Sequence, residues 1–246
     1  MISFFRDIWI VLRNLYYVLE FSLITIYHVY RGQYNRAVTT QGARYYWAEK
    51  TFKSVKLTYD VFHPENAVYQ KERSHILMSN HRSHYDIPLI MQALPGDIRF
   101  MAKRELLRVP IWSRASWVGE IIFVDRKNHE QALKDMEFAK KKMEDGIILW
   151  IAPEGTRSRT EKLNPFKKGG FMVALQTNAI IIPIGIRGTE RVLPPDSWRS
   201  KIGEHVEVHI GKPIDTSNYT IEDRDALMAD VRKQIHVLSV HNPSES

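Results

Sequence analysis

From about residue 55 onward, short apolar stretches that suit buried strands alternate with segments that suit helices. The stretches predicted as strands are 55–62, 76–78, 98–102, 121–124, 147–151, 180–186 and 206–210. The segments predicted as helices are 84–94, 104–117 with a break at Pro110, 129–143, and a closing helix over 221–240. Strands that alternate with helices in this way predict an α/β fold with a mixed, largely parallel sheet flanked by helices.

A sheet of this kind also predicts where a ligand would bind. In open α/β sheets, ligands sit beyond the carboxyl ends of the strands. The polar residues that directly follow the predicted strands are Asn80 and His81, Lys103 and Arg104, Asp125 and Arg126, and residues 154–157. If these strands are parallel neighbours, then a histidine, carboxylates and several cations meet at one edge of the sheet. The strand order itself is a hypothesis at this point.

The first 30 residues are strongly apolar and aromatic, and their polar interruptions include Arg6, Arg13 and Glu20. A spacing of seven residues places these three charges on one side of a helix. A membrane-spanning helix would bury Arg13 and Glu20, at roughly 2.5–3.5 kcal/mol for each charge near the bilayer centre. A helix lying in the interface keeps them among the headgroups. We expect an interfacial helix; a spanning helix and one packed on the protein's own core are the alternatives.

A second helical segment follows Gly32 and runs from about Arg36 to Lys53. It mixes aromatic residues such as Tyr45 and Trp47 with basic ones, which suits an anionic membrane surface. The alternative is a solvated helix with an ordinary apolar face. We therefore expect an amphipathic, membrane-associating helical hairpin over residues 1–54 and an α/β domain over residues 55–246.

Charge and composition narrow the classes of partner and chemistry. The formal charge of +7 and the pI of about 9.5 predict acidic partners, namely phosphate-bearing substrates, anionic lipid or nucleic acid. The absence of cysteine excludes disulfides, thiolate metal sites and thiol nucleophiles. The sequence also lacks a Gly-x-Ser-x-Gly elbow, a phosphate-binding loop and a dinucleotide fingerprint. Serine hydrolases, nucleotide hydrolases and dinucleotide oxidoreductases therefore lose support.

The densest group of chemically active side chains lies between two apolar runs, in residues 79–86. An Asp in the first turn of a helix can accept from one ring nitrogen of a preceding His, which leaves the other nitrogen free to take a proton. His81 and Asp86 have that spacing, but Asp86 could instead cap the helix while His81 is only a turn residue. A metal site built on His81, His84 and Asp86 matches none of the usual zinc spacings, so we expect no metal.

Three further positions offer cations to a phosphate, each with a structural alternative. In the turn Pro153-Glu154-Gly155-Thr156-Arg157-Ser158, Gly155 permits close backbone approach and Arg157 offers a bidentate fork. Arg157 could equally be solvated on a surface loop. Arg126 and Lys103 stand at predicted strand ends, where they could bind phosphate or form structural ion pairs, as Arg126 could with Asp125 or Glu130.

Taken in order, four motifs resemble those of the glycerolphosphate acyltransferase family, most closely the lysophosphatidate acyltransferases of bacterial type. The resemblance covers about residues 74–215, and four motifs in the correct order are far more specific than any one of them. The motifs are Asn80-His81-Arg82-Ser83-His84-Tyr85-Asp86, Gly119-Glu120-Ile121-Ile122-Phe123-Val124-Asp125-Arg126, Pro153-Glu154-Gly155-Thr156-Arg157-Ser158 and Ile182-Pro183-Ile184.

This resemblance implies an activity and a role for each matching residue. His81 would be the general base that deprotonates the free hydroxyl of lysophosphatidate, with Asp86 orienting it. The hydroxyl oxygen would attack the thioester of acyl-CoA or acyl-carrier protein directly and give phosphatidate for phospholipid synthesis. No other cofactor is implied. The residues implied in substrate binding are Lys103, Arg126, Glu154, Gly155, Thr156 and Arg157.

The resemblance also implies a location and leaves two alternatives. We expect association with an anionic membrane surface on the cytoplasmic face of the inner or plasma membrane, and no nucleic-acid partner. Ala152 stands where the family often has an aromatic residue, which affects acyl or headgroup preference. One alternative is an acyltransferase acting on another lysophospholipid or on glycerol phosphate. The other is a non-enzymatic basic module that binds membranes or nucleic acid.

Overall fold

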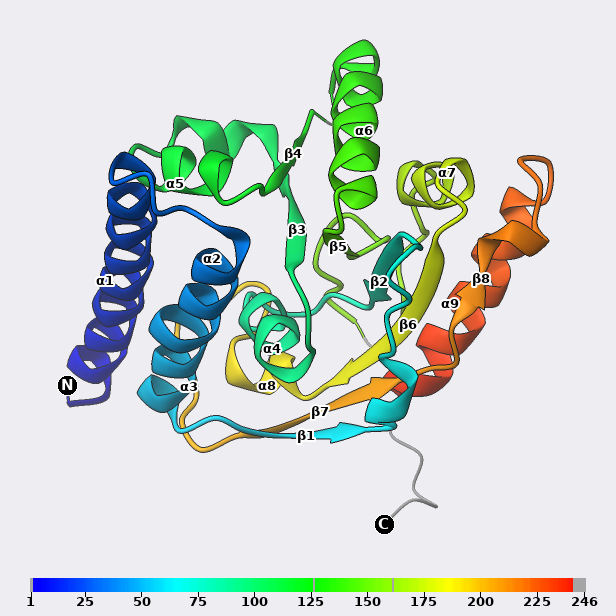
Figure 1. Cartoon of the computed structure of the whole chain (residues 1–246). Helices are drawn as coiled ribbons and strands as arrows, with labels where there is room; N and C mark the ends of the chain where they lie inside the picture. The colour runs from blue at the N-terminus through cyan, green and yellow to red at the C-terminus, as the bar shows by residue number, and fades with distance from the viewer. Residues whose placement is uncertain (1, 126, 161, 241–246) are drawn as a thin grey trace.

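The computed structural model describes residues 2–125, 127–160 and 162–240. Within these residues an eight-stranded sheet has the order β1-β7-β6-β2-β5-β3-β4, with β8 paired to β6 (Figure 1). The strands are β1 (Thr58–Phe62), β2 (His75–Ser79), β3 (Ile98–Lys103), β4 (Ile122–Val124), β5 (Ile148–Ile151), β6 (Ile180–Arg187), β7 (His205–Ile210) and β8 (Ile214–Asp215).

The sheet is mixed and largely parallel, as the alternating sequence pattern predicted. Only β7 and β8 run antiparallel to their neighbour β6 among the described pairings. β2 lies between β5 and β6 and is parallel to both. The central strands β2, β5 and β6 are rich in Ile and Leu and are buried on both faces, which is typical of parallel sheets covered by helices on each side.

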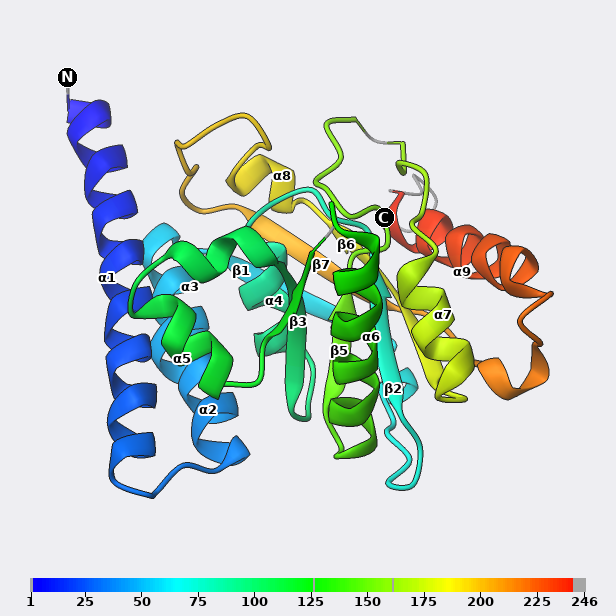
Figure 2. The ribbon, with the colours of Figure 1, turned by 90° about the horizontal axis from the view of Figure 1, so that it is seen from above.

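Helices cover both faces of the sheet (Figures 1 and 2). On one face Leu77 and Ile182 pack with Leu89 of α4. On the other face Ile76 and Phe171 share a core with residues of α6, α7 and α9. These helices and short turns are α4 (Asp86–Ala93), η3 (Arg104–Arg108), α5 (Trp112–Val118), α6 (His129–Glu144), α7 (Gly169–Gln176), α8 (Thr189–Val192), α9 (Arg224–Ser239), η2 (Pro64–Asn66) and η4 (Thr216–Asn218).

Most predicted elements are present, with differences at Pro110 and at short segments. The helix predicted over 104–117 is two pieces, η3 and α5, and Ile111 between them has a positive φ of 63°. The strand predicted from residue 55 begins at Thr58, because helix α3 (Glu49–Val55) occupies the earlier residues. The four-residue α8 and the two-residue β8 are too short to produce a hydrophobic period, so the sequence did not reveal them.

The amino-terminal region is the predicted helical hairpin. α1 (Ile2–Tyr30) is followed by a second helical arm made of α2 (Arg36–Gly42), a π-helical turn η1 (Ala43–Ala48) and α3. The side chain of Asn35 caps the second arm by accepting from Val38 N. Gly42 allows the two arms to touch, since a Cβ there would lie 2.6 Å from a ring carbon of Phe21.

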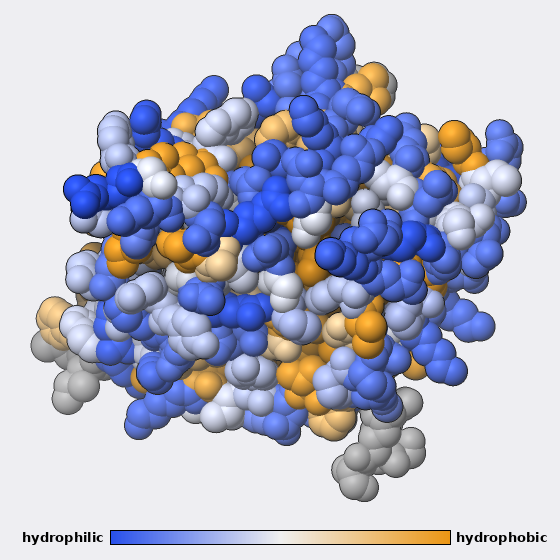
Figure 3. Space-filling view, viewed as in Figure 1, coloured by the Kyte–Doolittle hydropathy of each residue, from blue (hydrophilic) through white to orange (hydrophobic). Residues whose placement is uncertain are grey.

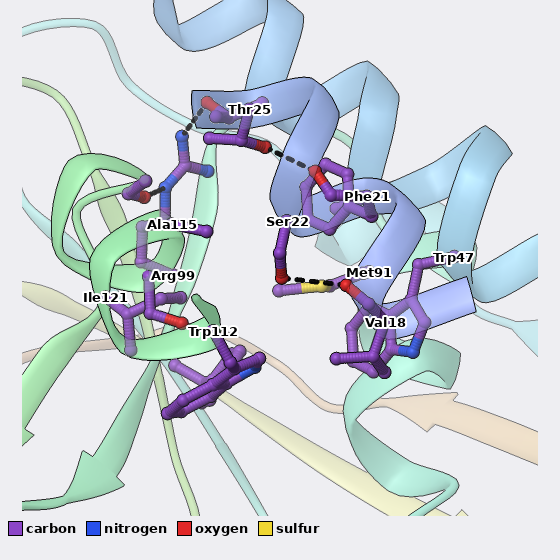
Figure 4. Close-up of a pocket in the computed structure, with 15 residues that line it drawn as sticks. Val18, Phe21, Ser22, Thr25, Trp47, Met91, Arg99, Trp112, Ala115 and Ile121 are labelled. Atoms are coloured by element: carbon purple, nitrogen blue, oxygen red, sulfur yellow. Dashed lines mark hydrogen bonds between the residues drawn. The ribbon is translucent and has the colours of Figure 1, made fainter. Parts of the chain in front are cut away.

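Buried polar contacts tie this hairpin to the sheet. The guanidinium of Arg99, in β3, donates to the hydroxyls of Thr39 and Thr40 on α2 and to the carbonyl of Gly119 after α5. Arg99 lines a cavity of about 70 Å³ between α1, η1 and α5 (Figure 4). That volume is well below the several hundred Å³ of ordinary ligand pockets. The division into a hairpin domain and an α/β domain remains a prediction.

Candidate active site

The first motif forms a His–Asp pair at the carboxyl end of the central strand β2. Nδ1 of His81 and Oδ2 of Asp86 are 2.7 Å apart. Because a carboxylate only accepts, Nδ1 carries the hydrogen and Nε2 is the unprotonated nitrogen of the neutral ring. Nε2 has no hydrogen-bond partner in the described part of the chain. The geometry is therefore that of a base held by its orienting carboxylate.

Asp86 is fully buried, and its charge is balanced by hydrogen-bond donors. Oδ2 also accepts from the backbone amides of Arg82 and Ser83, at 2.8 and 3.0 Å. Oδ1 accepts from the hydroxyl of Thr189 at 2.5 Å. A buried carboxylate without such donors would be strongly disfavoured, so these contacts stabilise its charged form. Asp86 is the first residue of α4, but no side chain of the described residues caps this helix, and its carboxylate accepts from amides that precede it. The alternative in which Asp86 caps the helix is therefore wrong.

The end of β2 is fixed to its neighbours on both sides. The side-chain amide of Asn80 exchanges two hydrogen bonds of 2.8 Å with the backbone of Ile186 in β6, which mimics one more rung of the strand pairing. On the other side, Trp150 of β5 donates to the hydroxyl of Ser79 at 3.0 Å. The Trp150 ring also packs edge-on against the imidazole of His81. His81 therefore leaves the sheet from a rigid point.

Glu154 holds the backbone of the active-site loops. One carboxylate oxygen accepts from the backbone amide of His81 at 3.1 Å, and the other from the amide of Asn164 at 2.7 Å. Burial raises the pKa of this carboxyl group, and the two amides only partly oppose that effect. Both oxygens already accept hydrogen bonds from backbone amides. A direct role of Glu154 in substrate binding remains a prediction.

The turn after β5 carries Arg157 and runs beside the loop that holds His81. Gly155 has a positive φ of 75°, which favours glycine, and its amide donates to the carbonyl of Ala152. The amide of Ser158 donates to the carbonyl of His81 at 2.7 Å, so the two loops run side by side. Nη1 of Arg157 is buried and has no hydrogen-bond partner among the described residues. A buried, unsatisfied guanidinium N–H group is unusual and suits an anionic ligand.

The sheet register places Lys103 at the same edge as His81. Ile148 of β5 is level with both Ile98 of β3 and His75 of β2, so Lys103 is level with Asn80. The side chain of Lys103 is exposed, as is that of Thr156. Arg126, which follows β4, lies outside the described residues. The expected convergence of β2, β3 and β5 at one edge is thus present, and substrate binding by Lys103, Thr156 and Arg126 remains a prediction.

His84, the third potential metal ligand of the first motif, is not part of a metal cluster. Among the residues that the structure describes, no group of three or more His, Asp or Glu side chains is arranged to hold a metal ion. Desolvation lowers the pKa of His84, and the nearby charges of Arg157 and His81 lower it further. A neutral His84 beside Arg157 fits a supporting position in an anion-binding site.

Thr189 is the site residue that the sequence reasoning missed. It follows β6 directly, after Gly188, whose φ is +91°. The rule that ligands bind beyond strand carboxyl ends applies to β6 as much as to the other strands. Applying it there would have identified the Thr189 hydroxyl, which the structure places on Asp86.

The outer face of α1 is unusually apolar for a helix on a protein surface. Exposed large apolar side chains recur every three or four residues along it, and we call this set the α1 stripe: Phe5, Trp9, Leu12, Tyr16, Leu19, Leu23, Tyr27 and Tyr30. The inward face instead buries Asp7, Ser22 and Thr25, and Glu20 pairs with Lys50 of the second arm at 2.7 Å. Over Phe4–Tyr30 the helix is long and apolar enough to cross a membrane, by length and composition.

Comparison with known proteins agrees with this architecture. Residues 61–187 match the family model described as Acyltransferase. The crystal structure of the 1-acyl-sn-glycerophosphate (LPA) acyltransferase, PlsC, from Thermotoga maritima is similar over 95% of this chain and 99% of that chain. The TM-score is 0.70 and the sequence identity 25%.

Two curated relatives carry the name 1-acyl-sn-glycerol-3-phosphate acyltransferase. The human alpha form is 32% identical over 165 residues, which are 67% of this chain and 58% of that protein. The Haemophilus influenzae protein is 33% identical over 146 residues, which are 59% of this chain and 60% of that protein. The chain thus spans somewhat under two thirds of these relatives. The family model covers more than half of the chain, and the resemblance seen in the four motifs is confirmed: the chain belongs to the acyltransferase family.

Proposed function

We propose that the protein transfers a fatty acyl group from an acyl thioester to the free hydroxyl of lysophosphatidate, giving phosphatidate. One arrangement carries this proposal: the loop of the base, His81, runs beside the turn that carries Arg157, and neither Nε2 of His81 nor the buried Nη1 of Arg157 has a hydrogen-bond partner among the described residues. A phosphate-bearing alcohol needs both groups, one for its hydroxyl and one for its phosphate. The names of the relatives from human, Haemophilus influenzae and Thermotoga maritima support the same acceptor.

The proton follows a short path in this mechanism. Nε2 of His81 takes the hydroxyl proton while the hydroxyl oxygen attacks the thioester carbonyl carbon. The resulting imidazolium is stabilised through its Nδ1–H group by Asp86. The tetrahedral intermediate then expels the thiolate, which takes the proton from Nε2 and leaves as a thiol. A base of this kind typically contributes about 10²–10⁴-fold to the rate, and positioning the two substrates together lowers the barrier further.

The phosphate of the acceptor would bind beside this base. We assign Nη1 of Arg157 to a phosphate oxygen, with Lys103 and Arg126 supplying further positive charge from neighbouring strand ends. Gly155 and Thr156 would bring the backbone of the turn close to the same group. Glu154 would contribute by holding that turn and the amide of His81 in place. Guanidinium groups suit this task because they bind phosphate with paired, charge-assisted hydrogen bonds.

The acyl donor would be acyl-CoA or acyl-carrier protein, and the acceptor would be taken from a membrane. The α1 stripe supports membrane association, because a contiguous apolar face of this size is a surface for lipid or partner contact. The net charge of +7 favours an anionic bilayer. We propose that α1 lies in the interface of the cytoplasmic leaflet, because its inward face packs on the protein, where Glu20 pairs with Lys50, while its outer face carries the α1 stripe.

The proposal is tested by identifying the product. Purified protein is incubated with anionic vesicles that contain lysophosphatidate, and with either acyl-CoA or acyl-carrier protein, and the lipids are analysed by mass spectrometry. We expect phosphatidate from the native protein and none above background from His81→Ala. Lysophosphatidylcholine and glycerol 3-phosphate serve as competing acceptors, and preference for either would replace lysophosphatidate in the proposal. Full activity in His81→Ala would overturn the mechanism, and nucleic-acid binding without any acyl transfer would overturn the activity.

A further inference from the structure

A second exposed apolar site lies next to the amino-terminal end of α1. Residues 193–204, which we call the α8 loop, connect α8 to β7 at the same edge of the molecule (Figure 2). Within it Trp198 is 46% exposed and Ile202 is also exposed. The Trp198 ring packs edge-on against Phe4 of α1, with centroids 6.0 Å apart. The apolar surface of α1 therefore continues onto a loop of the α/β domain.

Hydrogen bonds to α8 and to the first motif hold the α8 loop in place, so the exposure of Trp198 is a fixed feature of the fold. The amide of Lys201 donates to the carbonyl of Val192 at 2.8 Å, which closes the loop on α8. The buried hydroxyl of Ser200 lies 3.2 Å from the hydroxyl of Tyr85 in the first motif. The hydroxyl of Ser83 donates to the carbonyl of Leu193 at 2.9 Å. A fixed loop thus presents a large indole outward, and an ordered, exposed Trp marks a contact surface.

The charges around Trp198 indicate what that surface contacts. The guanidinium of Arg199 lies 5.2 Å over the Trp198 ring, and its side chain is 60% exposed. Lys201 is exposed two residues further on. An indole with neighbouring basic side chains suits the boundary between acyl chains and anionic headgroups. In Figure 3 the surface over α6 is mostly hydrophilic, whereas apolar residues reach the surface over α5, near α1.

We propose that the α8 loop is a second membrane contact, in which Trp198 enters the same anionic bilayer surface as the α1 stripe. Arg199 and Lys201 would lie among the headgroups. The proposal rests on the proposed membrane association of α1. Its consequence concerns the active site, because the segment that carries Trp198 begins with α8, where Thr189 holds Asp86. The bilayer would thereby be fixed relative to the His–Asp pair by the α/β domain itself, as well as by the hairpin.

The lack of cysteine in the chain allows a direct test. A single cysteine is introduced as Trp198→Cys, as Leu12→Cys in the α1 stripe, or as Val237→Cys, which is exposed on α9 at the opposite side of the molecule (Figure 1). Each is labelled with an environment-sensitive fluorophore and titrated with vesicles of phosphatidylglycerol and phosphatidylcholine. We expect a blue shift and increased emission at positions 12 and 198, and no change at 237.

The outcomes separate this inference from the proposal on which it rests. A response at position 12 without one at 198 overturns the α8-loop contact and leaves membrane association standing. The absence of a response at both 12 and 198 overturns membrane association itself. Equal responses at all three positions indicate adsorption without orientation and overturn the α8-loop contact. An independent check is co-sedimentation of unlabelled protein with the same vesicles, where Trp198→Ser should lower partitioning about 3- to 10-fold and the matched Val237→Ser should not.

Discussion

The hydroxyl of Thr189 donates a 2.5 Å hydrogen bond to Oδ1 of Asp86, although 103 positions separate the two residues. The other carboxylate oxygen, Oδ2, receives Nδ1–H of His81. Asp86 is therefore held from both sides, by the first motif and by the segment after β6. This relationship makes Thr189 a positioning residue for the base, since it touches Asp86 and not the reacting atoms.

Replacing Thr189 by Val should lower kcat by about 10-fold, because a hydrogen bond to a charged group is worth about 1.5–3 kcal/mol and only part of that is used in the transition state. The KM for lysophosphatidate should change little. Without this donor Asp86 is held less firmly, and so is the imidazole that it orients, so the loss is expected in kcat. Steady-state kinetics with lysophosphatidate as the varied substrate measure kcat and KM separately.

Two variants separate this role from general destabilisation. Thr189→Ser keeps the hydroxyl and should restore most of kcat. Thr216→Val removes another fully buried threonine hydroxyl, which bonds the carbonyls of Ala174 and Ala179 far from His81. It should lower the melting temperature without lowering kcat. An unchanged kcat in Thr189→Val would show that this hydroxyl does not act through Asp86.

Glu154→Gln tests whether Glu154 acts through the backbone. In the native protein the backbone amides of His81 and Asn164 each donate to one carboxylate oxygen of Glu154. In the variant, the NH₂ group of the glutamine faces one of these two amides and cannot accept from it. We expect a loss of about 1–3 kcal/mol in the free energy of unfolding together with a fall in kcat. Chemical denaturation and steady-state kinetics measure the two effects. A raised KM for lysophosphatidate with unchanged stability would instead show that Glu154 binds substrate directly.

Arg157→Ala should raise the KM for lysophosphatidate by about 10- to 100-fold, because the substrate phosphate loses a charge-assisted partner worth about 1.5–3 kcal/mol. Arg159 provides the matched control two residues away. Its side chain is 76% exposed and pairs with Asp196 at the surface. Arg159→Ala should leave the KM within about 2-fold, since exposed ion pairs contribute little. Equal increases in KM for Arg157→Ala and Arg159→Ala would show that Arg157 does not bind the substrate phosphate.

Much of the site could be predicted because its chemistry is local in sequence. His81 and Asp86 share one segment, so their contact depends only on a strand end and the first turn of a helix. Convergence of Lys103 and the 154–158 turn on that segment follows from parallel strands, whose carboxyl ends meet at one edge. The structure confirms the parallel neighbours β2, β5 and β3 that this inference required.

Contacts between segments far apart could not be predicted from one sequence. The Thr189–Asp86 bond depends on the placement of β6 next to β2, and no period or composition reveals strand order. The inward bonds of Glu154 depend on the path of the following loop to Asn164. Likewise, spacing placed Arg13 and Glu20 on one side of α1, but the pairing of Glu20 with Lys50 needed the second arm of the hairpin in place.

Glu120 connects α2 of the hairpin to α6 and gives a pH-dependent prediction. It accepts from Arg36 of α2 at 2.7 Å and from Lys142 of α6 at 2.8 Å. Burial alone would raise the pKa of Glu120, but these two cations outweigh it and hold the pKa at about 2. In the unfolded chain the pKa of this carboxyl group is near 4.5. Because the folded pKa is depressed, the stabilisation is complete above about pH 4.5 and is lost as the pH falls towards 2.

The Glu120→Gln variant should therefore be less stable than the native protein at pH 7 by roughly 2–3 kcal/mol. The difference between a pKa of about 2 and one near 4.5 corresponds to about 3.4 kcal/mol, and solvent screening of this partly buried group lowers that figure. The difference from the native protein should shrink as the pH is lowered from 4.5 towards 2, where the native carboxylate becomes protonated. Denaturant unfolding at several pH values measures this convergence. Glu49→Gln is the control, because Glu49 forms only an exposed pair with Lys53 on α3, and it should change stability by less than about 0.5 kcal/mol. A constant deficit for Glu120→Gln down to pH 2 would show that its ion pairs do not link the hairpin to the sheet.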